Sequence, residues 1–237
     1  MTNLSRRQWM QHGVFGLAAA GASGLVLQSD AAPTDETPDV HGYQQFLDEQ
    51  GIPRVRPAGK WEPSHKDILG PFHLAGAPFR GKVTPPLEPG ELLVVRGRVW
   101  GFDTKRPIPS AVLDVWQADA RGRYDLDDPS RPPQRSEFRN RIRLVTDETG
   151  FYEYETIRPA PYRVGQDAGA YRPAHIHYMV QAPGYAKLIT QLYFQGDRYI
   201  KTDRWASNSN LIIRPQKIKL PRGVYEQGTF DIVLAKR

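Results

Sequence analysis

The sequence predicts an all-β domain, a β-sandwich or a barrel, from three observations. Gly and Pro number 21 each among 237 residues, a density of turn formers that favours short strands over long helices. From Glu91 onward, short runs rich in β-branched and aromatic residues are bounded by Gly, Pro and Asp. Several runs alternate apolar and polar residues, as in Val112 to Trp116, which predicts sheets with one buried face.

Residues 1–32 have the order of an export signal. Arg6 and Arg7 precede the weakly apolar run Gly13–Leu27, and a small-residue end follows it. This order is similar to that of a twin-arginine signal. The alternative is an amphipathic helix packed on the domain, but the segment lacks a charged face at helical spacing. We therefore expect an exported protein, periplasmic or extracellular, with no stable membrane insertion after signal cleavage.

Residues 33–64 are predicted to form an extended N-terminal arm, because prolines recur there among polar and acidic residues. Tyr43–Gln50 is its candidate helix, ended by Gly51. Residues 65–237 form the predicted β domain, within which Asp127–Arg139 is a long loop. The eight strand candidates are Leu92–Trp100, Ala111–Gln117, Ile142–Thr146, Phe151–Ile157, Ala174–Ala182, Leu188–Phe194, Leu211–Arg214 and Thr229–Ala235.

Composition limits the chemistry that the chain can support. It contains no cysteine, which excludes disulfides, thiolate metal sites, iron–sulfur clusters and a cysteine nucleophile. Any metal must therefore be held by nitrogen and oxygen ligands. The formal net charge is +6, from 32 Lys and Arg against 26 Asp and Glu. Because the cations are scattered, no nucleic-acid partner is expected, whereas anionic small molecules such as aromatic acids would be attracted.

His175 and His177 are the first candidate ligands. Two positions apart on a predicted strand, they point to the same face of the sheet and can reach a common point. The alternative is a chance pair among six histidines, since single histidines are mostly solvated or structural. On its own the pair is weak support for a metal site.

Tyr124 and Tyr162 strengthen the metal interpretation. Tyr124 follows a predicted strand, and Tyr162 follows the proline-rich turn Arg158–Pro161; sites are commonly assembled at such strand ends. A trivalent metal lowers the pKa of a bound phenol, and two phenolates with two imidazoles suit ferric iron better than a soft cuprous ion. The alternative is that both tyrosines are ordinary aromatics of a β-sandwich.

Several motifs taken together resemble the intradiol ring-cleavage dioxygenases. They are Gly97–Gly101, Pro107–Ala111, Leu113–Ala118, Gly122–Tyr124, Pro161–Tyr162 and Arg172–His177, with the upstream loop Asp67–Phe72. Their order and separations are closely similar to those of the family, and the resemblance covers residues 65–235. Each motif alone is unspecific, whereas the joint match is specific.

The resemblance implies a prealbumin-like β-sandwich with long loops and few short helices, holding a mononuclear non-haem Fe(III) ion. The metal ligands that it implies are Tyr124, Tyr162, His175 and His177, with Tyr162 as the axial phenolate that a catecholate displaces. The implied activity is cleavage of a catechol-type aromatic by O2 to a cis,cis-muconate-type product.

The resemblance implies roles for two further polar residues. Arg172 matches the family arginine near the substrate ring, where its charge would stabilise negative charge developing on the ring; the alternative is a surface salt bridge. Gln191 resembles a polar residue at the back of the pocket; the alternative is an exposed strand glutamine. The catalytic candidates are therefore Arg172, Tyr162 and Gln191.

The sequence also departs from the family pattern. His73 stands where relatives often have tyrosine, which would alter the substrate pocket. The arm is too short for the helical dimerisation domain of the catechol and hydroxyquinol branches, so the chain resembles the protocatechuate 3,4-dioxygenase core more closely. A homo-oligomer is compatible with this resemblance. Two rival interpretations stay open: an exported non-enzymatic prealbumin-like binding module, and a structural Zn(II) or Cu(II) site on the same four ligands.

Overall fold

The computed structural model describes residues 45, 49, 61–126, 130–165, 170–207 and 209–237. The predicted signal lies outside these residues, as does most of the predicted arm; Gln45 and Glu49 of the candidate helix are helical. The chain divides into two compact units, Met1–Arg54 and Val55–Arg237, and the second contains the strands. Within the described residues, no helix is long and apolar enough to cross a membrane.

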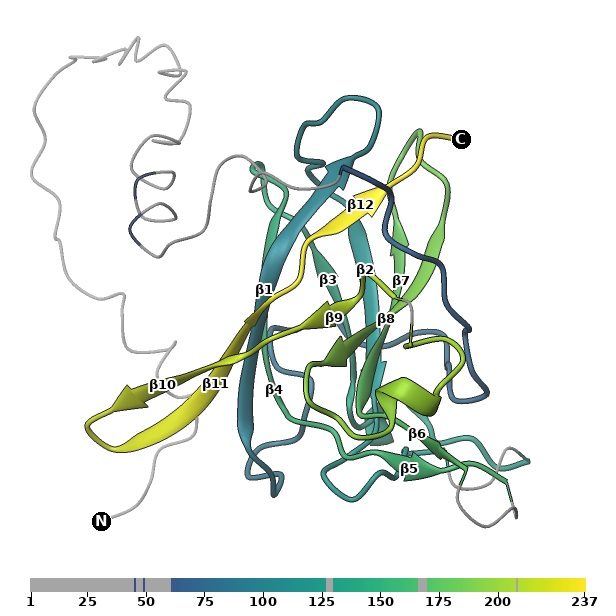
Figure 1. The fold of residues 1–237 in the computed structure, drawn as a ribbon, viewed down its shortest axis with the longest axis vertical. Helices are drawn as coiled ribbons and strands as arrows, with labels where there is room; N and C mark the ends of the chain where they lie inside the picture. Colours follow the sequence, from purple (N-terminus) through teal and green to yellow (C-terminus); the bar gives the residue numbers. More distant parts are fainter. Residues whose placement is uncertain (1–44, 46–48, 50–60, 127–129, 166–169, 208) are drawn as a thin grey trace, which may run out of the picture. The chain divides into compact units, whose positions relative to one another are not determined.

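Two five-stranded sheets face each other in the second unit, which confirms the predicted all-β sandwich (Figure 1). One sheet has the order β10 (Gln216–Leu220), β11 (Gly223–Thr229), β1 (Leu92–Gly101) and β12 (Ile232–Leu234), with β4 (Phe151–Ile157) paired to β1. The other has the order β3 (Arg141–Val145), β2 (Val112–Gln117), β7 (His175–Gln181), β8 (Leu188–Phe194) and β9 (Ile212–Ile213). Strands β5 (Tyr162–Arg163) and β6 (Tyr171–Arg172) form a separate antiparallel pair, and the 3-10 helices are η1 (Arg135–Glu137) and η2 (Ile200–Thr202).

Strand β7 divides its side chains between two surfaces. Ile176, Tyr178 and Val180 are buried in the core between the two sheets, and each such side chain contributes about 1.5–3 kcal/mol on burial. Because successive side chains of a strand point to opposite faces, His175 and His177 lie on the outer face of the sheet.

Loops cover this outer face and form a second, smaller apolar cluster. It consists of Trp116, Ala118 and Tyr124, with Leu69, Phe72, Tyr162 and Met179 packed against it. The Asp67–Phe72 loop is fixed to the sheet edge by the Asp67 N–H, which donates to the carbonyl of Ile189 (2.9 Å). The candidate site is therefore enclosed by a sheet on one side and by loops on the other.

The predicted strands agree with the structure to within one residue, except at the C-terminus. There the run Thr229–Ala235 is wrong as a single strand, because Thr229 ends β11 and β12 begins only at Ile232. The hairpin of β10 and β11, which projects from the sheet in Figure 1, was not predicted. Strand β10 has two apolar residues among five and is largely exposed, so its sequence lacks the hydrophobic pattern of a strand.

Candidate metal centre

Strand pairing brings the two candidate histidines beside the polar residues of neighbouring strands. His177 lies opposite Trp116 on β2 and opposite Gln191 on β8, while His175 lies opposite Tyr193 on β8. Because paired residues share a face of the sheet, these side chains line one continuous surface. Both histidines are buried, with 2% and 1% of their surface exposed.

A tight turn after β2 delivers Tyr124 to the same surface. The Asp119 carboxylate accepts hydrogen bonds from the backbone N–H groups of Arg121 (2.8 Å) and Arg123 (2.9 Å), which fixes the turn. Gly122 has φ +78°, and a Cβ on it would lie 2.8 Å from the Pro161 carbonyl oxygen and 2.9 Å from the Tyr162 Cβ. Only glycine permits this close approach, which places the Tyr124 segment directly against Tyr162.

The four candidate ligands converge. The Nε2 atoms of His175 and His177 are 3.1 Å apart, and the Tyr124 Oη lies 3.4 Å from the His175 Nε2. The Tyr162 ring centroid is 5.7 Å from that of Tyr124 and 5.5 Å from that of His175. Three separate segments of the chain therefore place two phenols and two imidazoles around one point. Among the described residues, no three His, Cys, Asp or Glu side chains group as a metal site.

The protonation states leave ligand atoms free at neutral pH. The His175 Nδ1 lies 2.6 Å from the Pro173 carbonyl oxygen, so this nitrogen carries the proton and the lone pair is on Nε2. Burial, helped by the charge of Arg172, lowers the pKa of His175 to about 3. Burial and the neighbouring His175 lower the pKa of His177 well below its ordinary value. Both imidazoles are therefore neutral ligands.

The two phenols are protonated until a cation binds beside them. Burial raises the pKa of Tyr124 well above its ordinary value, and the neighbouring Tyr162 raises it further. Burial likewise raises the pKa of Tyr162. A bound metal ion reverses this balance, because its charge is the largest in the site and stabilises the phenolate.

The donor set fits a ferric ion. Two imidazole nitrogens bound about 2.0–2.1 Å from one ion and at right angles are about 3 Å apart, which matches the observed Nε2 separation of 3.1 Å. Without an ion, two neutral nitrogen lone pairs would face each other in a buried site, and leaving both acceptors without a partner costs free energy. Neutral imidazoles and anionic phenolates are borderline and hard ligands that suit iron.

Aromatic and glycine contacts hold the candidate ligands in place. The Trp116 indole stacks on the His177 ring at 4.8 Å with 4° between the planes, and Phe72 stacks on Tyr124 at 4.0 Å and 10°. Gly70 has φ +70°, and a Cβ on it would lie 3.3 Å from the His177 Cε1. Neither Trp116 nor Gly70 was predicted as a site residue, although they lie in the motifs Leu113–Ala118 and Asp67–Phe72.

A surface cavity of about 480 Å³ leads to the two phenols. Besides Tyr124 and Tyr162, its lining includes Phe72, Leu126, Tyr171 and the three arginines Arg121, Arg123 and Arg163. An apolar and aromatic wall suits a planar ring, and the arginines favour an anionic ligand. Two of the four candidate ligands, Tyr124 and Tyr162, are therefore reached from this cavity.

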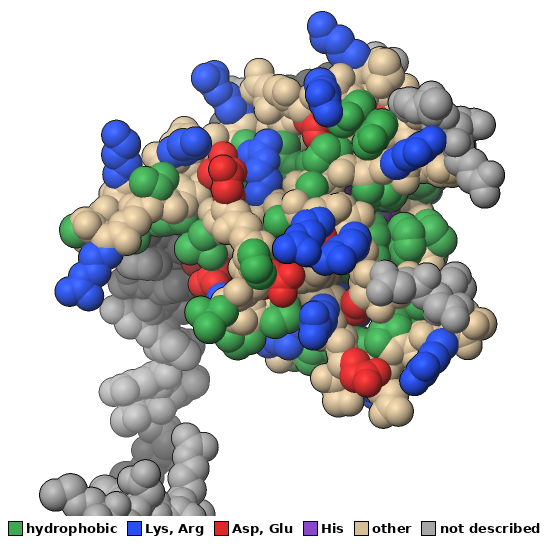
Figure 2. Space-filling model, turned by 90° about the horizontal axis from the view of Figure 1, so that it is seen from below, with side chains coloured by type: hydrophobic (Ala, Val, Ile, Leu, Met, Phe, Trp, Pro, Cys, Tyr) green, Lys and Arg blue, Asp and Glu red, His purple; other side chains and the backbone are tan. Residues whose placement is uncertain are grey.

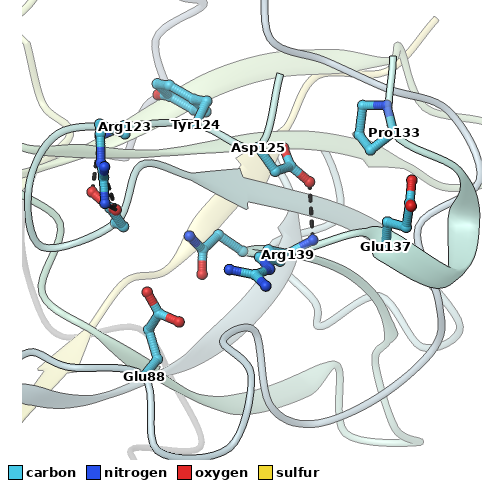
Figure 3. A pocket seen from close by; sticks show the side chains of 9 residues that line it. Glu88, Arg123, Tyr124, Asp125, Pro133, Glu137 and Arg139 are labelled. Atoms are coloured by element: carbon cyan, nitrogen blue, oxygen red, sulfur yellow. Dashed lines mark hydrogen bonds and ion pairs between the residues drawn. The ribbon is translucent and has the colours of Figure 1, made fainter. Parts of the chain in front are cut away.

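A second cavity, of about 380 Å³, shares Arg123 and Tyr124 with the first, and Figure 3 shows the side chains that line it. Its walls are charged, but their charges are largely used within the protein. The Arg123 guanidinium pairs with Asp119 at 3.2 Å, and the Asp125 carboxylate accepts from the Arg139 N–H at 2.9 Å. Asp119, Arg123 and Asp125 are therefore already engaged within the protein.

Arg172 and Gln191 belong to one buried network behind the candidate ligands. Their exposed fractions are 5% and 0%, so the surface salt bridge and the exposed strand glutamine are both wrong. The Arg172 Nη2 donates to the Gln191 Oε1 and to the Tyr193 Oη, each at 2.8 Å. Tyr193 in turn donates to the Asp67 Oδ2 (2.7 Å).

His73 lies behind the ligands instead of in the cavity. Its ring packs edge-on against Trp116 at 4.7 Å, and its Nε2 is 3.5 Å from the Asp114 Oδ2. It is not among the described residues that line the cavity of Tyr124 and Tyr162. His73 therefore supports the Trp116 ring, which in turn stacks on His177.

Comparison with known proteins places this geometry in a family. The model of the family described as Dioxygenase matches residues 70–236. The chain is 37% identical over 195 residues to a chlorocatechol 1,2-dioxygenase of Rhodococcus opacus, covering 74% of this chain and 73% of the relative. It is 36% identical over 176 residues to catechol 1,2-dioxygenase 2 of Acinetobacter lwoffii, covering 68% of this chain and 62% of the relative, so it spans less than two thirds of that protein.

A solved structure gives the same result. The 3-chlorocatechol 1,2-dioxygenase of Rhodococcus opacus 1CP superposes with a TM-score of 0.64 and 31% identity, covering 73% of each chain. The similarity thus extends over the sandwich and the segments that carry the candidate ligands. The chain belongs to the intradiol ring-cleavage dioxygenase family.

Proposed function

We propose that this protein is a non-haem Fe(III)-dependent dioxygenase that cleaves a catechol-type aromatic between its two hydroxyl-bearing carbons. O2 would supply both oxygen atoms of the cis,cis-muconate-type product. The observation that carries the proposal is the convergence of two phenols and two neutral imidazoles, with Nε2 atoms 3.1 Å apart, at the end of a cavity lined by both tyrosines.

Tyr124, Tyr162, His175 and His177 would hold the iron. Bound ferric iron supplies Lewis acidity, drawing electron density from a catecholate and presenting it to O2. The buried imidazoles contribute no charge, so the two phenolates are the anionic groups of the ligand set. This arrangement favours a trivalent ion over a divalent one.

Tyr162 is placed to take up a proton when the substrate enters. It is half-buried, unlike the buried Tyr124, and it lines the cavity. Its Oη, as a phenolate, would accept the proton of an incoming catechol hydroxyl. The positive charge of Arg172 opposes the effect of burial on Tyr124 and Tyr162 and favours the neutral form of both histidines, and it would likewise stabilise negative charge on a substrate ring held beside these ligands.

The cavity lining also favours a class of catechols. Arg121, Arg123 and Arg163 line it, and no Asp or Glu does so among the described residues. A carboxylate on the ring would therefore be attracted to the entrance. The panel of substrates to assay consists of catechol, 4-chlorocatechol, hydroxyquinol and 3,4-dihydroxybenzoate.

The experiment that tests the proposal is O2 uptake by the iron-loaded protein with this panel, with the products identified by mass spectrometry in 18O2. Incorporation of two labelled atoms into a ring-opened diacid supports the proposal. Binding of catechols without O2 uptake would indicate the non-enzymatic binding module. A purified protein that contains zinc or copper and takes up no O2 would indicate the structural site for one of those metals.

We further propose export through the twin-arginine pathway, which rests on Arg6 and Arg7 before a weakly apolar run. The full chain carrying Arg6→Lys and Arg7→Lys should accumulate inside the cell, while the parent appears in the periplasm or medium. Equal export of both would contradict the proposal.

A further inference from the structure

The loop around η2 holds a carboxylate against Arg172. The Asp203 Oδ2 lies 2.7 Å from the Arg172 Nε, and the two side chains are 2% and 6% exposed. This ion pair is buried, joins residues 31 positions apart in the sequence, and lies next to the candidate iron ligands through Arg172.

Asp203 is itself held rigidly. Its Oδ1 accepts hydrogen bonds from the backbone N–H of Trp205 (3.0 Å) and of Ala206 (2.8 Å). Both oxygens therefore have partners, one on the loop and one on Arg172. The carboxylate cannot rotate without losing its two backbone hydrogen bonds on one side and the ion pair with Arg172 on the other.

The Arg172 guanidinium is fixed from three directions. Asp203 lies at Nε, Gln191 and Tyr193 accept from Nη2 at 2.8 Å, and the Trp205 ring lies 4.6 Å from Cζ. Contacts at two edges and one face determine the plane of a guanidinium group. Removing the Asp203 contact leaves only one edge and the face to hold it.

We propose that Asp203 is a positioning residue that sets the orientation and charge balance of Arg172 toward the substrate. The inference rests on the proposed function, because Arg172 is assigned there to the substrate ring. A misplacement of about 1 Å in a positioning group can cost about 100-fold in rate. Asp203 thus acts through Arg172 and does not touch the substrate itself.

Asparagine cannot replace Asp203 in this role. Its side chain has one acceptor oxygen, whereas Asp203 presents one oxygen to two backbone N–H groups and the other to the Arg172 Nε. In either orientation an amide NH2 would face another donor. It would also leave the guanidinium charge buried without its counter-ion, which is strongly unfavourable.

The first test is a double-mutant cycle in turnover of the iron-loaded protein. Asp203→Asn should lower kcat about 10- to 100-fold with little change in iron content or visible spectrum, and Asp203→Glu should recover part of it. In an Arg172→Gln background, Asp203→Asn should lower kcat by less than 3-fold. Losses that multiply in the double variant would overturn the proposal.

The second test does not depend on activity. In the iron-free chain, Asp203→Asn should lower the melting temperature more in the parent than in the Arg172→Gln background, because the cost lies in the unpaired charge. Asp147→Asn is the matched control: Asp147 also fixes a turn, accepting from the Thr149 and Phe151 N–H groups, and should show equal shifts in both backgrounds. Equal shifts for Asp203→Asn would overturn the pairing.

The two tests separate this inference from the proposed function. If the parent cleaves no catechol but the melting cycle shows coupling, the proposed function fails while the Asp203–Arg172 pair stands. If the parent is active and Asp203→Asn retains full kcat, the positioning role fails while the proposed function stands.

Discussion

The chemistry at the residue scale depends on which atoms of four side chains carry protons. His175 presents its Nε2 lone pair because its Nδ1 proton is held by the Pro173 carbonyl, and burial keeps both histidines neutral. Burial also keeps the two phenols protonated until a cation arrives. At neutral pH the site therefore offers two neutral imidazole nitrogens and two phenols that lose their protons when a trivalent metal binds.

Tyr162→Phe and Arg172→Gln should fail in different ways. Tyr162→Phe removes a proposed ligand oxygen, so iron content should fall or visible absorption should shift. Arg172→Gln removes a charge that acts on the substrate, so iron and colour should persist while kcat falls about 100- to 1,000-fold. Metal analysis, absorption spectra and O2 uptake on both variants check this, and an Arg172→Gln variant with parental turnover would contradict the assigned role.

Gly70→Ala should weaken iron binding through His177. The added Cβ would lie 3.3 Å from the His177 Cε1 at a φ of +70°, so it introduces both backbone strain and pressure on the imidazole. Gly184→Ala is the control, because Gly184 has φ +81° but no atom within 4 Å of the added Cβ. Both variants should lose about 1–2 kcal/mol of stability from the left-handed backbone, but only Gly70→Ala should release iron faster to a chelator. Equal release rates would show that Gly70 does not support the site.

At the scale of elements, the two sheets meet through tyrosines. The Tyr154 hydroxyl of β4 contacts the Tyr178 hydroxyl of β7 across the sandwich, while within the first sheet the Tyr152 hydroxyl donates to the Phe230 carbonyl. Burial raises the pKa of all three above the ordinary tyrosine value. The core is therefore sensitive to alkaline conditions.

Alkaline pH should destabilise the folded chain through these buried tyrosines. Above pH 10 the unfolded chain loses these phenol protons while the folded chain keeps them, so the free energy of unfolding falls as pH rises beyond 10. Urea unfolding from pH 8 to pH 11 should show this decline. Tyr154→Phe with Tyr178→Phe should make this decline shallower, because two of the buried phenols are then absent. A decline of the same slope in the parent and in this double variant would contradict the assignment.

The sequence predicted elements well where the hydrophobic pattern is strong. Strand β4 and strand β8 match to the residue, because Phe151–Ile157 and Leu188–Phe194 combine β-formers with clear boundaries. Strand β10 was missed because pairing with β11, and not its own pattern, makes Gln216–Leu220 a strand. Likewise, nothing local indicated that Asp203 would meet Arg172, since that contact depends on how the η2 loop folds back on the sheet.

At the scale of the whole molecule, the candidate ligands join three segments that are distant in the chain. Tyr124 follows β2, Tyr162 lies in β5 and the histidines lie in β7. Figure 2 shows Lys and Arg side chains spread over one face with Asp and Glu among them, so the described cations of this face do not form a single patch. The positive charge that bears on the site is the local charge of Arg172 and of the arginines at the cavity.

Bound iron should stabilise the fold by linking these segments. A ligand at 100 times its dissociation constant adds about 2.7 kcal/mol of stability, which for a domain of this size corresponds to about 5–10 °C in melting temperature. Thermal unfolding of iron-free and iron-loaded protein checks this, with His175→Ala plus His177→Ala as the control that should show no shift. Identical melting of the iron-free and iron-loaded parent would mean that the segments do not share a metal.

The most direct test of the central claim is ferric loading of the purified protein, followed by metal analysis and a visible absorption spectrum. Two phenolates on one ferric ion predict one iron per chain and a strong visible band that weakens or shifts when Tyr124 or Tyr162 is changed to phenylalanine. A protein that stays colourless after loading, or that holds zinc in place of iron, would contradict the account.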